Sequence, residues 1–164
     1  MRLYYILLLF IVLSGMFSCL KPQHKSNVST PQIPQFDSVK AVQLGADEYG
    51  MKTYVMAFLK RGPNSSLDSV HKGDLQQAHL KNIQNLAEKG KLVLAGPFLD
   101  NGEIRGIYIF DVPTIDEARK LTETDPAIKA GILTMELKPW YGSAALLELN
   151  ALHTAIQKRS ITNE

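Results

Sequence analysis

One helical stripe between segments of strand composition restricts the possible fold of this chain more than any other feature. Between residues 74 and 89, apolar side chains recur on one face of a helix, and His79 lies on that face. The apolar members of the stripe are Leu75, Ala78, Ile83, Leu86 and Ala87. Gly90 follows directly and is typical of a helix C-terminus. The pattern predicts an amphipathic helix that packs against a sheet and buries a histidine.

Segments of strand composition lie on both sides of this helix. Residues 52–60 precede it, and residues 91–97 and 106–112 follow it, with a hairpin turn signal at 100–103 between them. Residues 132–138 form a fourth such segment. The sequence therefore predicts four strands.

Two further helical segments complete the pattern. Thr114 and Glu117 form a capping-box signature for a helix that extends to about residue 124, and Ser143 can cap a last, leucine-rich helix. The order is βαββαβ, the ferredoxin-like arrangement, with an extra C-terminal helix. We expect an α+β fold in which two helices cover one face of a four-stranded antiparallel sheet.

The other face of this sheet needs a cover of its own. Tyr54, Met56 and Phe58 alternate along the first strand and point to one side, where they would otherwise meet water. A second copy of the chain is the simplest cover. We therefore expect a homodimer that packs sheet against sheet.

The N-terminus has the composition of an export segment. Arg2 supplies a positive charge, and residues 3–17 are almost wholly apolar but shorter than the roughly 20 residues of a membrane span. Cys19, the only cysteine, follows at the place that resembles the lipobox of bacterial lipoproteins. We expect an export signal at 1–18, acylation of Cys19 and a periplasm-facing protein anchored to a membrane of the bacterial cell envelope. An uncleaved anchor, or ordinary cleavage that leaves a free thiol, are the alternatives.

The rest of the chain divides into a flexible tether at 19–48 and one folded domain at 49–164. The tether is rich in proline and polar residues and shows no period. The whole chain has 18 basic and 16 acidic side chains, without the basic stripe that a nucleic-acid partner requires. No histidine has a partner at metal-ligand spacing, and no glycine-rich phosphate loop occurs. The sequence therefore indicates neither a metal nor a nucleotide cofactor.

His79 and Asp125 are the candidate chemical residues, and each also has a structural interpretation. A histidine on an apolar face is commonly a hydrogen-bonded core residue, and Asp125, before Pro126, is a natural helix cap. If the two meet, the carboxylate fixes the imidazole tautomer and leaves the other ring nitrogen available as a base. Spacing alone does not pair them.

Several short motifs occur along the chain in the same order as in a known domain family. They are His79, residues 86–90, residues 92–97, Asp125 with Pro126, Gly131, and Pro139 with Trp140. Over about residues 51–141 the chain resembles the YciI-related (YCII) domain family. The resemblance implies a dimeric α/β barrel with a pocket around a His–Asp pair, which matches His79 and Asp125, and with Gly96 and Pro97 at the pocket edge. The family includes a dehydrochlorinase of chlorinated hydroxyquinols in which this pair is assigned acid–base roles.

Three functional hypotheses remain open at this point. The first is an enzyme without a cofactor in which His79 is a general base, Asp125 orients it, and a small polar or aromatic molecule undergoes elimination or hydrolysis. The second is a lipid-anchored binding or assembly module without catalysis. The third is a haem protein that uses a histidine ligand.

Overall fold

The computed structural model describes residues 35–66 and 68–161, and its residues from 37 onward belong to one compact unit. The predicted export signal, Cys19 and most of the predicted tether lie outside the described residues. The last part of the tether segment contains the short helix α2 (Ser38–Gln43), which Asp37 caps by accepting from the backbone N–H of Lys40. This cap favours a helical conformation at residues 38–43, which the polar composition of the tether did not predict.

The sheet has four antiparallel strands in the order β2-β3-β1-β4. They are β1 (Met51–Arg61), β2 (Leu92–Pro97), β3 (Ile104–Phe110) and β4 (Leu133–Ser143). β4 is longer than expected and runs through Pro139, which an edge strand tolerates. The strand order is that of the ferredoxin-like arrangement, so the predicted α+β fold is confirmed.

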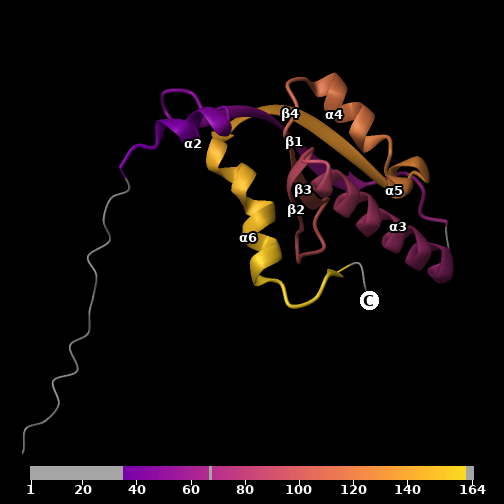
Figure 1. Ribbon diagram of the computed structural model, residues 1–164. Helices are drawn as coiled ribbons and strands as arrows, with labels where there is room; N and C mark the ends of the chain where they lie inside the picture. The colour runs from indigo at the N-terminus through magenta and orange to yellow at the C-terminus, as the bar shows by residue number, and fades with distance from the viewer. Residues whose placement is uncertain (1–34, 67, 162–164) are drawn as a thin grey trace, which may run out of the picture. The chain divides into compact units, whose positions relative to one another are not determined.

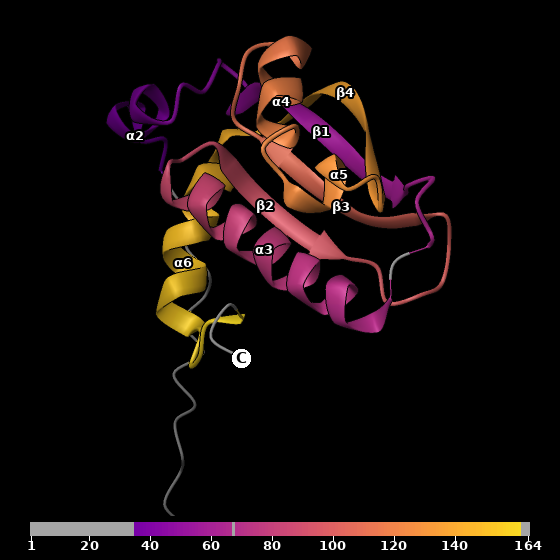
Figure 2. The ribbon, with the colours of Figure 1, turned by 90° about the vertical axis from the view of Figure 1, so that its right-hand side faces the viewer.

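Helices from both βα connections cover one face of the sheet. α3 (Ser69–Glu88) joins β1 to β2, and α4 (Ile115–Thr122) and α5 (Pro126–Lys129) lie between β3 and β4. Figures 1 and 2 show all three on the same side. α3 begins five residues before the apolar stripe, because its first turn is solvated and capped by Asp68. It ends before Gly90, which has a φ of +66°.

The main core lies between these helices and the sheet. Its buried side chains alternate along the central strands and meet residues of α3 and α4. The members are Val55, Ala57, Leu59, Leu86, Leu92, Tyr108, Phe110, Val112 and Ala118. The candidate functional residues lie at the margin of this core.

The opposite face is covered in part by the chain's own C-terminus. The 3₁₀ helix η1 (Ala144–Glu148) and the helix α6 (Leu149–Ile156) follow β4, and Figure 1 shows α6 on the side of the sheet away from α3 and α4. Leu146 and Leu147 pack on a second buried cluster formed by Tyr54, Val93 and Ile109.

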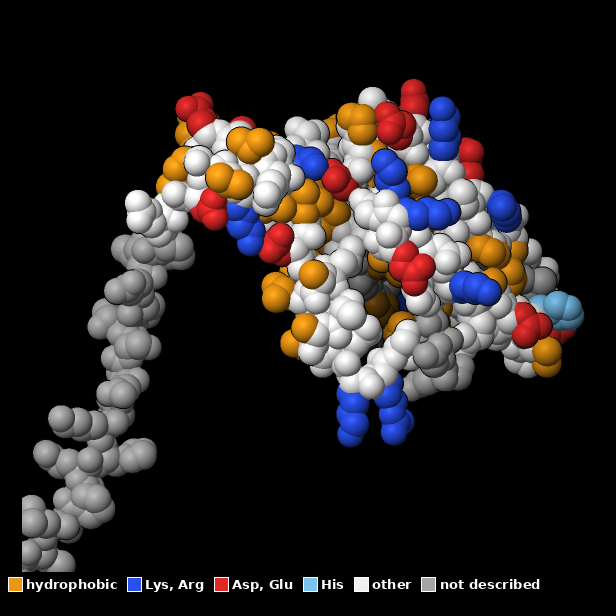
Figure 3. All heavy atoms as spheres, in the orientation of Figure 1, with side chains coloured by type: hydrophobic (Ala, Val, Ile, Leu, Met, Phe, Trp, Pro, Cys, Tyr) orange, Lys and Arg blue, Asp and Glu red, His pale blue; other side chains and the backbone are white. Residues whose placement is uncertain are grey.

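The rest of this face is more open. Met56 and Phe58 are only half-buried, and Figure 3 shows a hollow with hydrophobic side chains beside α6. The sequence assigned the whole cover to a second subunit, whereas η1 and α6 supply part of it. The homodimer itself stays a prediction.

Candidate functional site

A buried histidine–carboxylate pair connects α3 to the start of α5. Nδ1 of His79 lies 2.6 Å from Oδ2 of Asp125, and the two residues are 7% and 1% exposed. An ionised carboxylate only accepts hydrogen bonds, so Nδ1 of the imidazole carries the proton and donates. The second ring nitrogen, Nε2, is left as the acceptor of a neutral imidazole. His79 thus lies on the buried face of its helix, as the helical spacing indicates, and it contacts the aspartate that the family resemblance pairs with it.

Asp125 also begins the short helix α5. Its Oδ1 accepts from the backbone N–H of Ala127 at 2.8 Å, with Pro126 at the first helical position. The structural and functional interpretations of Asp125 thus hold together, because each carboxylate oxygen serves one of them. The helix start holds the carboxylate in place, and the carboxylate holds the imidazole.

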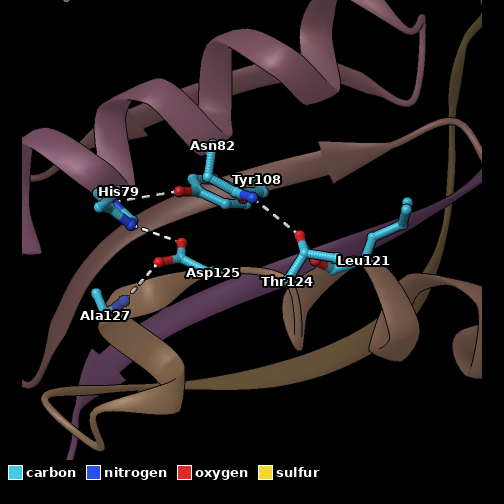
Figure 4. Close-up of polar contacts among 7 residues, drawn as sticks. All are labelled: His79, Asn82, Tyr108, Leu121, Thr124, Asp125 and Ala127. Atoms are coloured by element: carbon cyan, nitrogen blue, oxygen red, sulfur yellow. Dashed lines mark hydrogen bonds and ion pairs between the residues drawn. The ribbon is translucent and has the colours of Figure 1, made fainter.

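Tyr108 is a third member of the site that the sequence did not reveal. Its hydroxyl lies 3.3 Å from Nε2 of His79, and the two rings stack with centroids 6.3 Å apart (Figure 4). Burial, reinforced by the negative charge of Asp125, raises the pKa of Tyr108. The phenol therefore stays protonated and donates a hydrogen bond to Nε2. Its place in the apolar run of β3 marked it only as a core residue.

A second polar contact lies beside this triad. Asn82, three residues after His79 on α3, donates from Nδ2 to Oγ1 of Thr124 at 2.9 Å, and Thr124 donates in turn to the carbonyl of Leu121 at 2.7 Å. Figure 4 shows both chains of contacts between α3 and the segment before α5. Oδ1 of Asn82 is buried and has no donor among the described residues.

No hydrogen bond joins Gly96 or Pro97 to this pair among the described residues. They end β2 and pair with Ile107 and Gly106 of β3. Ala95 pairs with Tyr108, so alternation along β2 directs the α-hydrogen of Gly96 to the opposite face of the sheet. A Cβ at Gly96 would meet nothing within 4 Å, so packing does not require glycine there. Their role at a ligand pocket stays a prediction.

The other described histidines do not form a comparable site. His71 pairs with Asp68 at 2.7 Å, but both side chains are exposed, and His153 is exposed on α6. Over residues 35–66 and 68–161, no group of three His, Cys, Asp or Glu side chains is placed to hold a metal ion. In the same part of the chain, no helix is long and apolar enough to cross a membrane.

Comparison with known proteins gives the family. The model of the YCII-related domain matches residues 53–141, just over half of the 164 residues. The chain belongs to the YCII-related domain family. His79, Asp125, Tyr108 and Asn82 all lie within the matched range of this YCII-related domain, whereas η1 and α6 follow it.

A solved structure and the curated proteins add little to this assignment. The 5-chloro-2-hydroxyhydroquinone dehydrochlorinase of Burkholderia phenoliruptrix, solved with 2,5-dihydroxybenzoquinone, is 24% identical and has a TM-score of 0.41. The match covers 52% of this chain and 92% of that chain. No curated protein matches.

Proposed function

We propose that this YCII-related domain binds a small polar or aromatic molecule and uses His79 as a general base that Asp125 orients. The observation that carries the proposal is the 2.6 Å contact between two side chains that are almost completely buried. A carboxylate in that position fixes the tautomer with Nε2 as the acceptor, and it stabilises the imidazolium that forms when Nε2 takes a proton.

Proton transfer at Nε2 suits elimination or hydrolysis. In elimination, Nε2 takes a proton from a carbon of the substrate, the C–H electron pair forms the new double bond, and a leaving group departs from the neighbouring carbon. In hydrolysis, Nε2 takes a proton from water, the water oxygen forms a bond to an electrophilic atom of the substrate, and the leaving group departs from that atom with the electron pair of the broken bond. General-base catalysis by one side chain contributes about 10²–10⁴ in rate. Neither route draws on a cofactor, and no cofactor is proposed.

The ligand has to replace Tyr108 at Nε2. The separation of 3.3 Å is long for a hydrogen bond from a hydroxyl, whereas the bond to Asp125 is short. The imidazole is thus held firmly from one side and loosely from the other. Exchange of the Tyr108 hydroxyl for a substrate group would leave in place the bond from Nδ1 to Asp125 that orients His79, and the ligand would have to accept from the buried hydroxyl in turn.

The proposed setting of the domain is the cell envelope. Support comes from the sequence, where the apolar residues 3–17 precede Cys19, the proposed site of acylation. We also propose a homodimer through the sheet face, because Phe58 and Ile107, which pair across β1 and β3, remain only half-buried. No nucleic-acid partner is proposed, since the 18 basic and 16 acidic residues nearly balance.

A matched pair of histidines makes the catalytic proposal testable. The protein is screened against a panel of hydroxylated and halogenated aromatic compounds, with binding followed by NMR and product by mass spectrometry. His79→Gln should lose turnover by about 10²–10⁴-fold. His71→Gln is the control, because His71 also pairs with an aspartate but lies at the surface. Equal losses in both variants, or none in His79→Gln, would contradict the proposal.

A non-catalytic binding or assembly module is the second candidate. It is favoured by the enclosure of His79, because both ring nitrogens already have partners and the side chain is only 8% exposed. In that case His79→Gln changes the stability but no reaction, and a protein partner can be crosslinked to the domain in intact cells. Turnover that depends on His79 would exclude this candidate.

A further inference from the structure

The orientation of the Asn82 amide is fixed by its neighbour. Oγ1 of Thr124 uses its own proton in the bond to the carbonyl of Leu121, so this oxygen can only accept from Asn82. The amide nitrogen of Asn82 therefore faces Thr124. The amide oxygen must point the other way, and a flipped amide would set two acceptors against each other.

This orientation leaves a buried acceptor beside the proposed base. Oδ1 of Asn82 has no donor among residues 35–66 and 68–161, although buried polar atoms are nearly always hydrogen-bonded. Asn82 follows His79 by three positions on α3, so the two side chains are neighbours on one helix face. Nε2 of His79, on the same face, has only the long contact to Tyr108. The site thus offers a ligand two hydrogen-bond acceptors, Oδ1 of Asn82 and Nε2 of His79, that no described residue satisfies with a short hydrogen bond.

The charges around these acceptors exclude one large class of ligand. Asp125 contributes a buried negative charge, and no lysine or arginine makes a hydrogen bond or ion pair with His79, Asn82 or Tyr108 in the described chain. The Tyr108 hydroxyl can donate, but a carboxylate or phosphate would also meet the two acceptors and the negative charge of Asp125. Hydroxyl and amine groups can donate the hydrogen bonds that both acceptors need.

We propose that Asn82 is a specificity-determining residue whose amide oxygen accepts a hydrogen bond from a hydroxyl or amine group of the ligand. The ligand class is then a neutral or cationic hydrogen-bond donor with at least two donor groups, one for Asn82 and one for His79. This inference rests on the proposed function, since it assigns the substrate class of the same site.

The test compares matched probes and matched variants. Catechol offers two hydroxyl donors, its dimethyl ether offers none, and benzoate is an anion of similar size. Affinities are measured by NMR titration of the full chain and of Asn82→Leu, which has nearly the same volume without the amide. Asn85→Leu is the control, because Asn85 lies exposed one turn further along α3. Asn82→Ala is used if Asn82→Leu does not fold.

The expected result is that catechol binds, the dimethyl ether and benzoate do not, and Asn82→Leu loses about tenfold in affinity, as for one buried hydrogen bond. Asn85→Leu should match the wild type. Catechol binding that depends on His79 but not on Asn82 would overturn this inference and leave the proposed function intact. Absence of any probe whose binding depends on His79 would overturn both.

Discussion

The carboxylate of Asp125 accepts two hydrogen bonds, and its replacement by a carboxamide forces a choice between them. Oδ2 accepts from Nδ1 of His79 at 2.6 Å, and Oδ1 accepts from the N–H of Ala127 at 2.8 Å. Asparagine has one acceptor oxygen and one donor nitrogen. A backbone N–H cannot lose its proton, whereas an imidazole can carry its proton on either nitrogen. In Asp125→Asn we therefore expect Ala127 to keep its bond and His79 to move its proton to Nε2.

The contacts set the size of the effect on stability. Asp125→Asn keeps the helix cap and replaces a charge-assisted bond by a neutral one, which costs about 1–2 kcal/mol of the free energy of unfolding. Asp125→Ala leaves the buried donors of His79 and Ala127 without an acceptor, at about 1–3 kcal/mol for each donor. Since the whole domain is stable by about 5–15 kcal/mol, Asp125→Asn should fold well and Asp125→Ala should be close to its limit.

Two measurements separate the tautomer from the stability. Urea unfolding gives the free energy for the wild type, Asp125→Asn and Asp125→Ala. Long-range proton–nitrogen NMR spectra show which nitrogen of His79 carries the proton. Asp125→Asn should place it on Nε2 and lose base activity even though the protein folds. The reasoning is refuted if the proton stays on Nδ1, or if Asp125→Ala is as stable as Asp125→Asn.

Three further predictions concern the surroundings of the site. Gly96→Ala should leave stability unchanged because its Cβ has open space, whereas Gly106→Ala should lower the urea midpoint because its Cβ would lie 2.6 Å from the carbonyl oxygen of Gly96; equal midpoints would be inconsistent with this packing. The hydrogen bond from Lys60 lowers the pKa of Glu136 from 4.5 to about 2, so its contribution to stability is present above pH 4.5 and is lost as the pH falls to about 2. Urea midpoints of wild type and Glu136→Gln should therefore differ at pH 6 and converge near pH 2; a constant difference would count against this pair. Burial raises the pKa of Tyr108, so Tyr108→Phe should leave the phenolate absorbance of the native protein unchanged up to about pH 10, and a loss of absorbance there would show an accessible phenol.

The sequence predicted that the side chain of His79 points into the core, but it did not by itself identify the hydrogen-bond partners Asp125 and Tyr108. Helical spacing alone places His79 on the buried face of α3, as the structure shows. Asp125 is 46 residues away, so no local pattern relates the two, and the pairing came from the family resemblance. Tyr108 was missed because an aromatic residue in an apolar strand is ordinarily a core residue. Only the fold shows that its hydroxyl reaches Nε2.

The orientation of β2 could not be read from the sequence for a different reason. The register of β2 against β3 shifts between Leu92 and Leu94, so one extra residue lies in the strand. Such a bulge changes the face to which every following residue points. Gly96, which the family resemblance places at the pocket edge, pairs with Ile107 after the bulge, and its role at a pocket stays a prediction. The local composition of β2 carries no signal for this shift.

The C-terminal segment restricts the homodimer that we propose. The matched family range ends at residue 141, and Leu147, which packs on the cluster of Tyr54, Val93 and Ile109, comes after it. Displacement of η1 and α6 by a partner would break the bond from Asn150 to the carbonyl of Leu92 and expose an apolar cluster. A partner that contacts the half of the face around Ile107 avoids that cost. Ile107→Cys should therefore crosslink two chains and Leu147→Cys should not, because Leu147 packs on the cluster of Tyr54, Val93 and Ile109; crosslinking at Leu147→Cys alone would show that η1 leaves this cluster.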